Sequence, residues 1–370
     1  MNKFKSYLKW RYFISFVTNN HKFKNVRLNN YDNYRGFSIL LVVFLHLISF
    51  YTGEFSFYDD LYKFLYTFLM PSFFFISGYF SKVDTDIIKS FKRLLIPFII
   101  FSIIYATELF LFFGKPINFS MFFIVKGYLW FLMSLFLMKL ILPILDRIKH
   151  VFYLSLIIAL LVGFTSTYVL SIPKMLCFLP FFILGYNYKI YLKNLNSFIE
   201  KLNLFKIKKL FNNPIFCFIL LIIAFILAWL LASNIPKSAY LMSVTYNSLG
   251  VGHVHLPIPE ILIKILSRLS ILILGVIIVI LINHLMPKNK TFLTIFGINS
   301  LAVYLLHMPF IRLILKIDNI GIFHFLKTNL IFSLIFLIII SIILTYILSR
   351  NIVTKFVNKL NDFIADLLLK

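Results

Sequence analysis

Long apolar runs, each about the length of a membrane-spanning helix, recur along the whole chain. A helix needs about 20 mostly apolar residues to cross the hydrocarbon core, and ten segments meet this requirement, with boundaries good to about three residues. They cover residues 36–53, 62–80, 94–113, 121–143, 151–170, 175–191, 214–232, 266–286, 292–312 and 329–349. Backbone polar groups in lipid must be satisfied within the segment, so such runs are helical. The pattern predicts an all-α transmembrane bundle of about ten spanning helices, with no internal repeat.

Composition agrees with this pattern. Hydrophobic residues make up 61% of the 370 residues, whereas a soluble domain has roughly half. The two cysteines, Cys177 and Cys217, lie in apolar runs and fit no disulfide framework. His253 and His255 share one loop but lack a third ligand, so no metal site is predicted.

The net charge is +24, from 37 basic and 13 acidic residues. In a soluble protein this charge would suggest a nucleic-acid partner. The sequence contains no basic-aromatic nucleic-acid module, so nucleic acid is not predicted as a partner. The N-terminal arm, the even-numbered connections and the tail hold 26 Lys and Arg, and the other connections hold 10. The positive-inside rule therefore places both termini in the cytoplasm. The predicted partner of the whole surface is the lipid bilayer.

Three regions are expected along the chain. Residues 1–30 form a basic, aromatic arm on the cytoplasmic membrane surface, because its charges interrupt any cleavable signal. Residues 31–350 form the membrane domain, and residues 351–370 an amphipathic cytoplasmic tail with apolar positions at helical spacing. A second amphipathic stretch covers 192–211, and the longest outer connection covers about 233–262.

One face of the first predicted span carries both a cation and an imidazole. Arg35 lies at the cytoplasmic end, and His46 follows 11 residues later, about 16 Å deeper. Eleven residues are close to three turns, so the two side chains share a face. Ionisable groups inside a span are costly and often functional, and the pKa of imidazole suits proton transfer. This indicates a path for an anionic cytoplasmic ligand to a proton-handling histidine; otherwise Arg35 is a topological anchor and His46 a buried hydrogen-bond partner.

Other polar positions are candidates for a site. Lys92 and Arg93 precede the third span and either bind phosphate or mark the cytoplasmic side. Glu108 needs a partner or a proton inside the third span, unless it lies near the outer surface. His307 lies toward the outer end of the ninth span, with Asn299 about two turns below it.

Six segments, in order, resemble the acyltransferase family 3 of integral membrane proteins, most closely its fucose 4-O-acetylase-like branch. The first is Asp32, Arg35 and Gly36 with Leu41-Val42-Val43 and His46; the others are Met70 to Tyr79, Lys92 to Pro97, Leu129 to Leu132, Phe178 to Tyr186, and Gly297 to His307. The resemblance covers about residues 30–350. One departure is Leu45, which replaces the glycine usual before the histidine.

This resemblance implies a multi-pass enzyme of the plasma membrane, expected in a bacterium. It implies transfer of an acetyl or other short acyl group from cytoplasmic acyl-CoA, by default acetyl-CoA, to a hydroxyl of a sugar or polysaccharide. His46 is then the essential histidine with Arg35 as its partner, and Arg35, Lys92 and Arg93 bind the donor. The acceptor is expected near Glu108, Trp130, Asn299, His307 and the outer 233–262 connection, although Trp130 is also a normal interface anchor.

Two other functions fit the same pattern. Ten spans with buried polar residues also suit an exporter of a glycan or lipid-linked intermediate, although paired repeats would be expected there. A non-catalytic membrane partner of glycan-assembly enzymes is the third reading, and it would survive the loss of His46. The sequence does not name the acceptor, and it leaves open whether an acyl-imidazole forms on His46.

Overall fold

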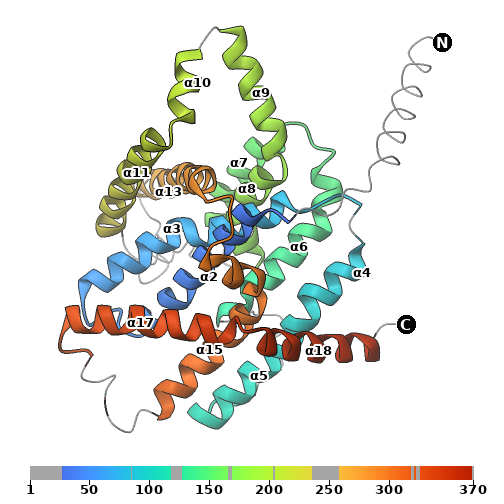
Figure 1. Ribbon diagram of the computed structural model, residues 1–370, viewed down its shortest axis with the longest axis vertical. Coiled ribbons are helices and arrows are strands. Elements are labelled where there is room, and N and C mark those ends of the chain that lie inside the picture. The colour runs from blue at the N-terminus through green and yellow to red at the C-terminus, as the bar shows by residue number, and fades with distance from the viewer. Residues whose placement is uncertain are drawn as a thin grey trace.

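The computed structural model describes residues 27–84, 86–117, 127–165, 169–202, 205–235, 258–317, 321 and 326–368. Within these ranges the chain is almost entirely helical and contains no β-strand, as predicted (Figure 1). Most of the expected N-terminal arm and of the 233–262 connection, with His253 and His255, lies outside the described residues.

Each predicted span overlaps a helix in the part of the chain that the structure describes. The elements are α2 (Asn29–Ile48), α3 (Ser56–Tyr79), α4 (Ile87–Ser90), η1 (Phe91–Leu95), α5 (Ile96–Phe113), η3 (Gly127–Leu129), α6 (Trp130–Leu145), α7 (Val151–Leu161), η4 (Val162–Phe164), α8 (Ile172–Tyr186), α9 (Tyr188–Lys201), α10 (Phe205–Asn212), α11 (Pro214–Asn234), α13 (Ile258–Leu285), α14 (Phe292–Ile298), α15 (Ser300–Ile317), α17 (Leu330–Leu348) and α18 (Asn351–Leu368). The two predicted amphipathic stretches fall on α9–α10 and on α18.

Among the described residues, five helices are long and apolar enough to cross a membrane, or up to seven if two bent pairs each count as one span. The five are Ile87–Phe112, Gly127–Leu145, Pro214–Asn234, Ile261–Leu285 and Leu330–Leu348. The pairs are α8 with α9, bent by 61°, and α14 with α15, bent by 82°. Helices α2 and α3, which carry polar residues into the bundle, and the short α7 account for the difference from ten. The count of ten spans and the cytoplasmic termini stay predictions.

Helix α2 lies in the centre of the bundle, where it packs against α3, α14, α15 and α17 (Figure 1). Its contact with α14 is so close that a β-carbon at Gly36 would overlap the carbonyl oxygen of Leu293, and one at Gly297 would overlap that of Asp32. Helices α3 and α8 cross in the same way at Gly78. Small residues allow such backbone approach between membrane helices.

The start of α2 is fastened by a buried asparagine. The Asn33 amide donates hydrogen bonds of 2.8 Å to the carbonyl oxygens of both Pro287 and Asn289. Its carbonyl oxygen accepts from the hydroxyls of Thr291 and Thr294, at 2.9 and 2.6 Å. All of its strong donors and acceptors are used, and the Arg35 end of α2 is therefore held in one position.

Candidate functional site

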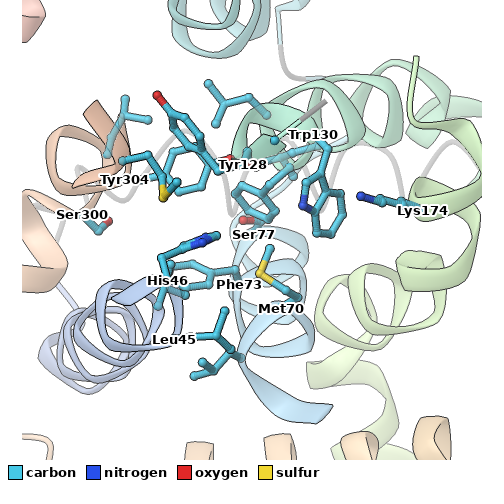
Figure 2. A pocket seen from close by; sticks show the side chains of 18 of the residues that line it. Leu45, His46, Met70, Phe73, Ser77, Tyr128, Trp130, Lys174, Ser300 and Tyr304 are labelled. Atoms are coloured by element: carbon cyan, nitrogen blue, oxygen red, sulfur yellow. Dashed lines mark hydrogen bonds between the residues drawn. The ribbon is translucent and has the colours of Figure 1, made fainter. Parts of the chain in front are cut away.

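A central cavity of about 450 Å³ lies between α2, α3, α6, α8 and α15 (Figure 2). Its lining on α3 runs from Tyr62 to Ser77, which corresponds to about 22 Å at 1.5 Å per residue. The cavity is therefore elongated along the bundle. Most of its wall is apolar or aromatic, with a few polar side chains, which is typical of ligand sites.

Arg35 and His46 both line the central cavity, which confirms that they share one face of the first helix. Arg35 lies 3.5 Å from the carboxylate of Asp32 and stacks on the ring of Phe80, 4.9 Å from its centroid. Asp32 is shared with Arg27, at 2.5 Å. The Asp32 carboxylate thus forms ion pairs with both arginines, and it orients the guanidinium of Arg35.

His46 faces a second histidine. The ring centroids of His46 and His307 are 5.0 Å apart, with the planes tilted by 42°. His46 is only partly buried and reaches the cavity, whereas His307 is fully buried behind it. The structure therefore brings together two predicted site residues that are 261 positions apart in the sequence.

The hydrogen bonds of His307 define its tautomer. Its Nδ1 lies 2.7 Å from the carbonyl oxygen of Tyr304 and 3.1 Å from that of Val303. Carbonyl oxygens only accept, so Nδ1 carries the proton and Nε2 of the neutral ring is an acceptor. Nε2 is buried and has no hydrogen-bond partner among the described residues. An unpaired acceptor beside His46 is available to bind an N–H of that ring.

Behind His307 lies a buried ion pair. Arg312 of α15 contacts Glu108 of α5 at 2.6 Å, and its guanidinium stacks on Tyr105 and Tyr128, 4.5 and 5.8 Å from the ring centroids. Glu108 thus has the partner that its position in a span demands. It does not line the central cavity, and neither does His307.

The two tyrosines beside His307 lock α15 to the start of α6. The hydroxyl of Tyr128 donates to the carbonyl oxygen of Leu305 at 3.0 Å, and the hydroxyl of Tyr304 donates to the carbonyl oxygen of Tyr128. The ring of Tyr128 lies 5.3 Å from that of His307. These contacts hold the His307 imidazole against α2.

Cations gather where the cavity reaches Arg35, called here the Arg35 end. Lys139 of α6 interacts electrostatically with Arg35, Lys89 and Arg93. Lys92 and Arg93 lie on η1, a short π-helical turn, and the backbone carbonyl of Lys92 accepts a hydrogen bond of 2.9 Å from Asn361. Neither Lys92 nor Arg93 lines the cavity itself, but the neighbouring Leu94 does.

The opposite end of the cavity, called here the Lys174 end, combines aromatic rings with one cation. Lys174, in the first turn of α8, places its ammonium 5.0 Å from the ring centroid of Trp130 (Figure 2). Trp130 begins α6, and Lys139 lies nine residues further along that helix, about 13 Å away. His46, about 16 Å from Arg35 along α2, lies toward this aromatic end of the cavity.

Some expected site residues lie elsewhere. Asn299 occupies the 82° bend between α14 and α15, where its amide donates to the carbonyl oxygen of Ser349 at 2.6 Å; it does not line the cavity. Sequence reasoning missed Lys174, Lys139 and Arg312. Lys174 and Arg312 were counted only among the ten cations of the outer connections, and Lys139, inside the fourth predicted span, was given no role. Only the folded chain shows that Lys174 lines a cavity and that Arg312 pairs with a carboxylate.

Comparison with known proteins identifies the family. An acyltransferase domain of family 3 matches residues 28–350, well over half of the chain. No curated protein and no solved structure matches the chain. The matched range begins one residue before α2 and ends with α17, so it contains the whole cavity and both histidines. The chain therefore belongs to acyltransferase family 3, a family of membrane acyltransferases.

Proposed function

We propose that this protein is an O-acyltransferase that moves an acetyl or other short acyl group from cytoplasmic acyl-CoA to a hydroxyl of a sugar or cell-surface polysaccharide. The observation that carries the proposal is the place of His46. It lies in the wall of an elongated cavity that Arg35 lines at one end and Trp130 and Lys174 at the other, in a chain of an acyltransferase family.

The donor enters at the Arg35 end. Coenzyme A is a polyanion, and Arg35, Lys89 and Arg93 each interact electrostatically with Lys139 there. Cations bind phosphate strongly, and arginine does so with two parallel hydrogen bonds. Lys92 belongs to the same turn as Arg93 and adds to the positive potential around the entrance. The thioester then extends into the cavity toward His46.

The chemical step needs a base at the acceptor hydroxyl. One nitrogen of neutral His46 takes the proton as the hydroxyl oxygen attacks the thioester carbonyl. The tetrahedral intermediate collapses, the C–S bond breaks, and the proton passes from His46 to the departing thiolate. The products are the O-acyl ester and free CoA.

His307 is the positioning residue for this step. Its Nε2 is an unpaired acceptor beside the His46 ring, so it can bind the N–H of His46. That hydrogen bond selects which nitrogen of His46 faces the substrate and stabilises the imidazolium formed on proton transfer, as a carboxylate does in a hydrolase triad.

The test follows release of the CoA thiol from acetyl-CoA by the purified protein in nanodiscs, with surface glycans as acceptors. Wild type should release CoA in an acceptor-dependent way, and His46→Ala should lose this release while keeping its thermal stability, since His46 faces a cavity. Release unaffected by the substitution would remove His46 from the mechanism. No release with any acyl-CoA or acceptor would contradict the proposal and favour a glycan exporter, to be followed by flux assays.

A further inference from the structure

We infer that the acceptor carries an anionic group, a carboxylate or a phosphate, and that Lys174 binds this group at the Lys174 end of the central cavity. The inference rests on the proposed function, because it assigns the class of acceptor to the same site. It begins from a cation that has no counter-ion.

Lys174 lines the cavity, and its ammonium lies over the ring of Trp130. Among the described residues it makes no ion pair and donates no hydrogen bond. Lys174 is half-buried. A cation partly removed from water without an anion is unfavourable, and a ring face compensates only part of that cost. The three N–H donors of its ammonium are thus available for a ligand.

Among the described residues that line the cavity, none neutralises this charge. Its described lining includes Arg35 and Lys174, one at each end, and no aspartate or glutamate. Two carboxylates of the bundle are already engaged: Asp32 with Arg27 and Arg35, and Glu108 with Arg312. A low-dielectric cavity with cations at both ends attracts anions from both sides.

The two cations serve different ligands. The phosphates of the donor are held at the Arg35 end, where Lys139 interacts electrostatically with Arg35, Lys89 and Arg93. Its reacting thioester must lie near His46, about 16 Å from Arg35 along α2. Lys174 lies at the end of the cavity away from the donor phosphates, so the anion that it binds belongs to the acceptor.

The experiment compares matched acceptors that differ only in charge. One pair is a glucoside and the corresponding glucuronoside; the other is a glycoside with and without a phosphate ester. Wild type should show a kcat/KM at least about tenfold higher for the anionic member, because one charge-assisted hydrogen bond changes affinity by about that factor. The pair that shows the preference distinguishes carboxylate from phosphate.

The variants are Lys174→Gln, Lys174→Arg and the control Lys316→Gln, which removes an exposed cation whose contact is a carbonyl of α5. Lys174→Gln should lose the preference mainly through KM for the acceptor. Lys174→Arg should keep most of it, and the control should keep all of it. Equal use of charged and neutral acceptors by wild type, or an unchanged preference in Lys174→Gln, would overturn the inference.

Binding without turnover separates this inference from the proposed function. The anionic glycoside should change the fluorescence of Trp130, identified by its loss in Trp130→Phe, and Lys174→Gln should weaken that binding about tenfold. Such binding without CoA release would support the anion site and contradict acyl transfer. CoA release with neutral acceptors alone would support acyl transfer and contradict the anion site.

Discussion

At the scale of single residues, two histidines of one bundle lie in unlike surroundings. His46 reaches the cavity, while His307 is buried and held by two backbone carbonyls. The sequence alone predicted that Arg35 and His46 share a face, because helical spacing decides that. The sequence-based prediction placed His307 near an acceptor rather than behind His46. No spacing rule relates residues on two helices that are far apart in the chain.

His307→Phe tests the positioning role. The substitution keeps a ring of similar size but removes Nε2, so we expect kcat to fall on the order of 10²-fold with little change in KM for the acyl-CoA. His307→Gln, which restores an acceptor near the same place, should recover part of the loss. A wild-type kcat in His307→Phe would show that His46 works without this partner. Steady-state kinetics of CoA release provides the measurement.

The Arg35 end provides a second test at this scale. Arg35→Lys keeps the charge but loses the planar donor pair that binds phosphate at two points. We expect KM for acetyl-CoA to rise about tenfold while kcat changes little, since Arg35 lies about 16 Å from His46 along α2. Lys327→Gln is the control, because Lys327 pairs with Glu54 and neither residue lines the cavity. A lower kcat with unchanged KM would place Arg35 outside donor binding.

At the scale of elements, apolar runs predicted where helices lie but not where they bend. The run 292–312 was expected as one span, and the structure divides it at Asn299 into α14 and α15 with an 82° bend. The amide of Asn299 bonds to the end of α17 rather than to its own helix. Hydropathy averaged over a window does not detect such a bend, because the residues on both sides are apolar.

The buried pair of Glu108 and Arg312 connects α5 to α15 and should be sensitive to removal of one partner. Arg312→Met leaves an unpaired carboxylate, at a cost of about 3 kcal/mol or more. The double variant Glu108→Gln with Arg312→Met leaves no charge and should recover much of the stability. Thermal unfolding in detergent compares the two. A double variant as unstable as Arg312→Met would show that Arg312 acts through its ring contacts instead.

At the scale of the whole molecule, contacts between connections agree with the sidedness predicted from charge. Glu54, expected outside, pairs at 2.6 Å with Lys327, also expected outside. The tail residue Asn361 bonds to Lys92, both expected in the cytoplasm. Each contact places its two connections on one side of the bundle, and which side is cytoplasmic stays a prediction of the positive-inside rule.

Cysteine labelling tests that topology. Cys177 and Cys217 are buried thiols that form no disulfide, and they are the two cysteines of the sequence. A background in which both are alanine therefore carries no thiol. Added to it, Lys359→Cys on α18 should react with an impermeant maleimide only in opened cells, and Lys327→Cys should react in intact cells. Both positions are exposed. Reaction of both positions from the same side would overturn the assignment of the termini.

The close helix crossings have a consequence for how sequences of this fold can diverge. At Gly36 and Gly297 an added methyl group would meet a backbone carbonyl of the other helix, and Gly185 meets that of Phe75 in the same way. A backbone oxygen is present whatever the residue, so no substitution in the partner helix can make room. Such glycines should stay fixed without covarying with any other position, and contact prediction from covariation should miss the crossings that hold α2 and α3 in place.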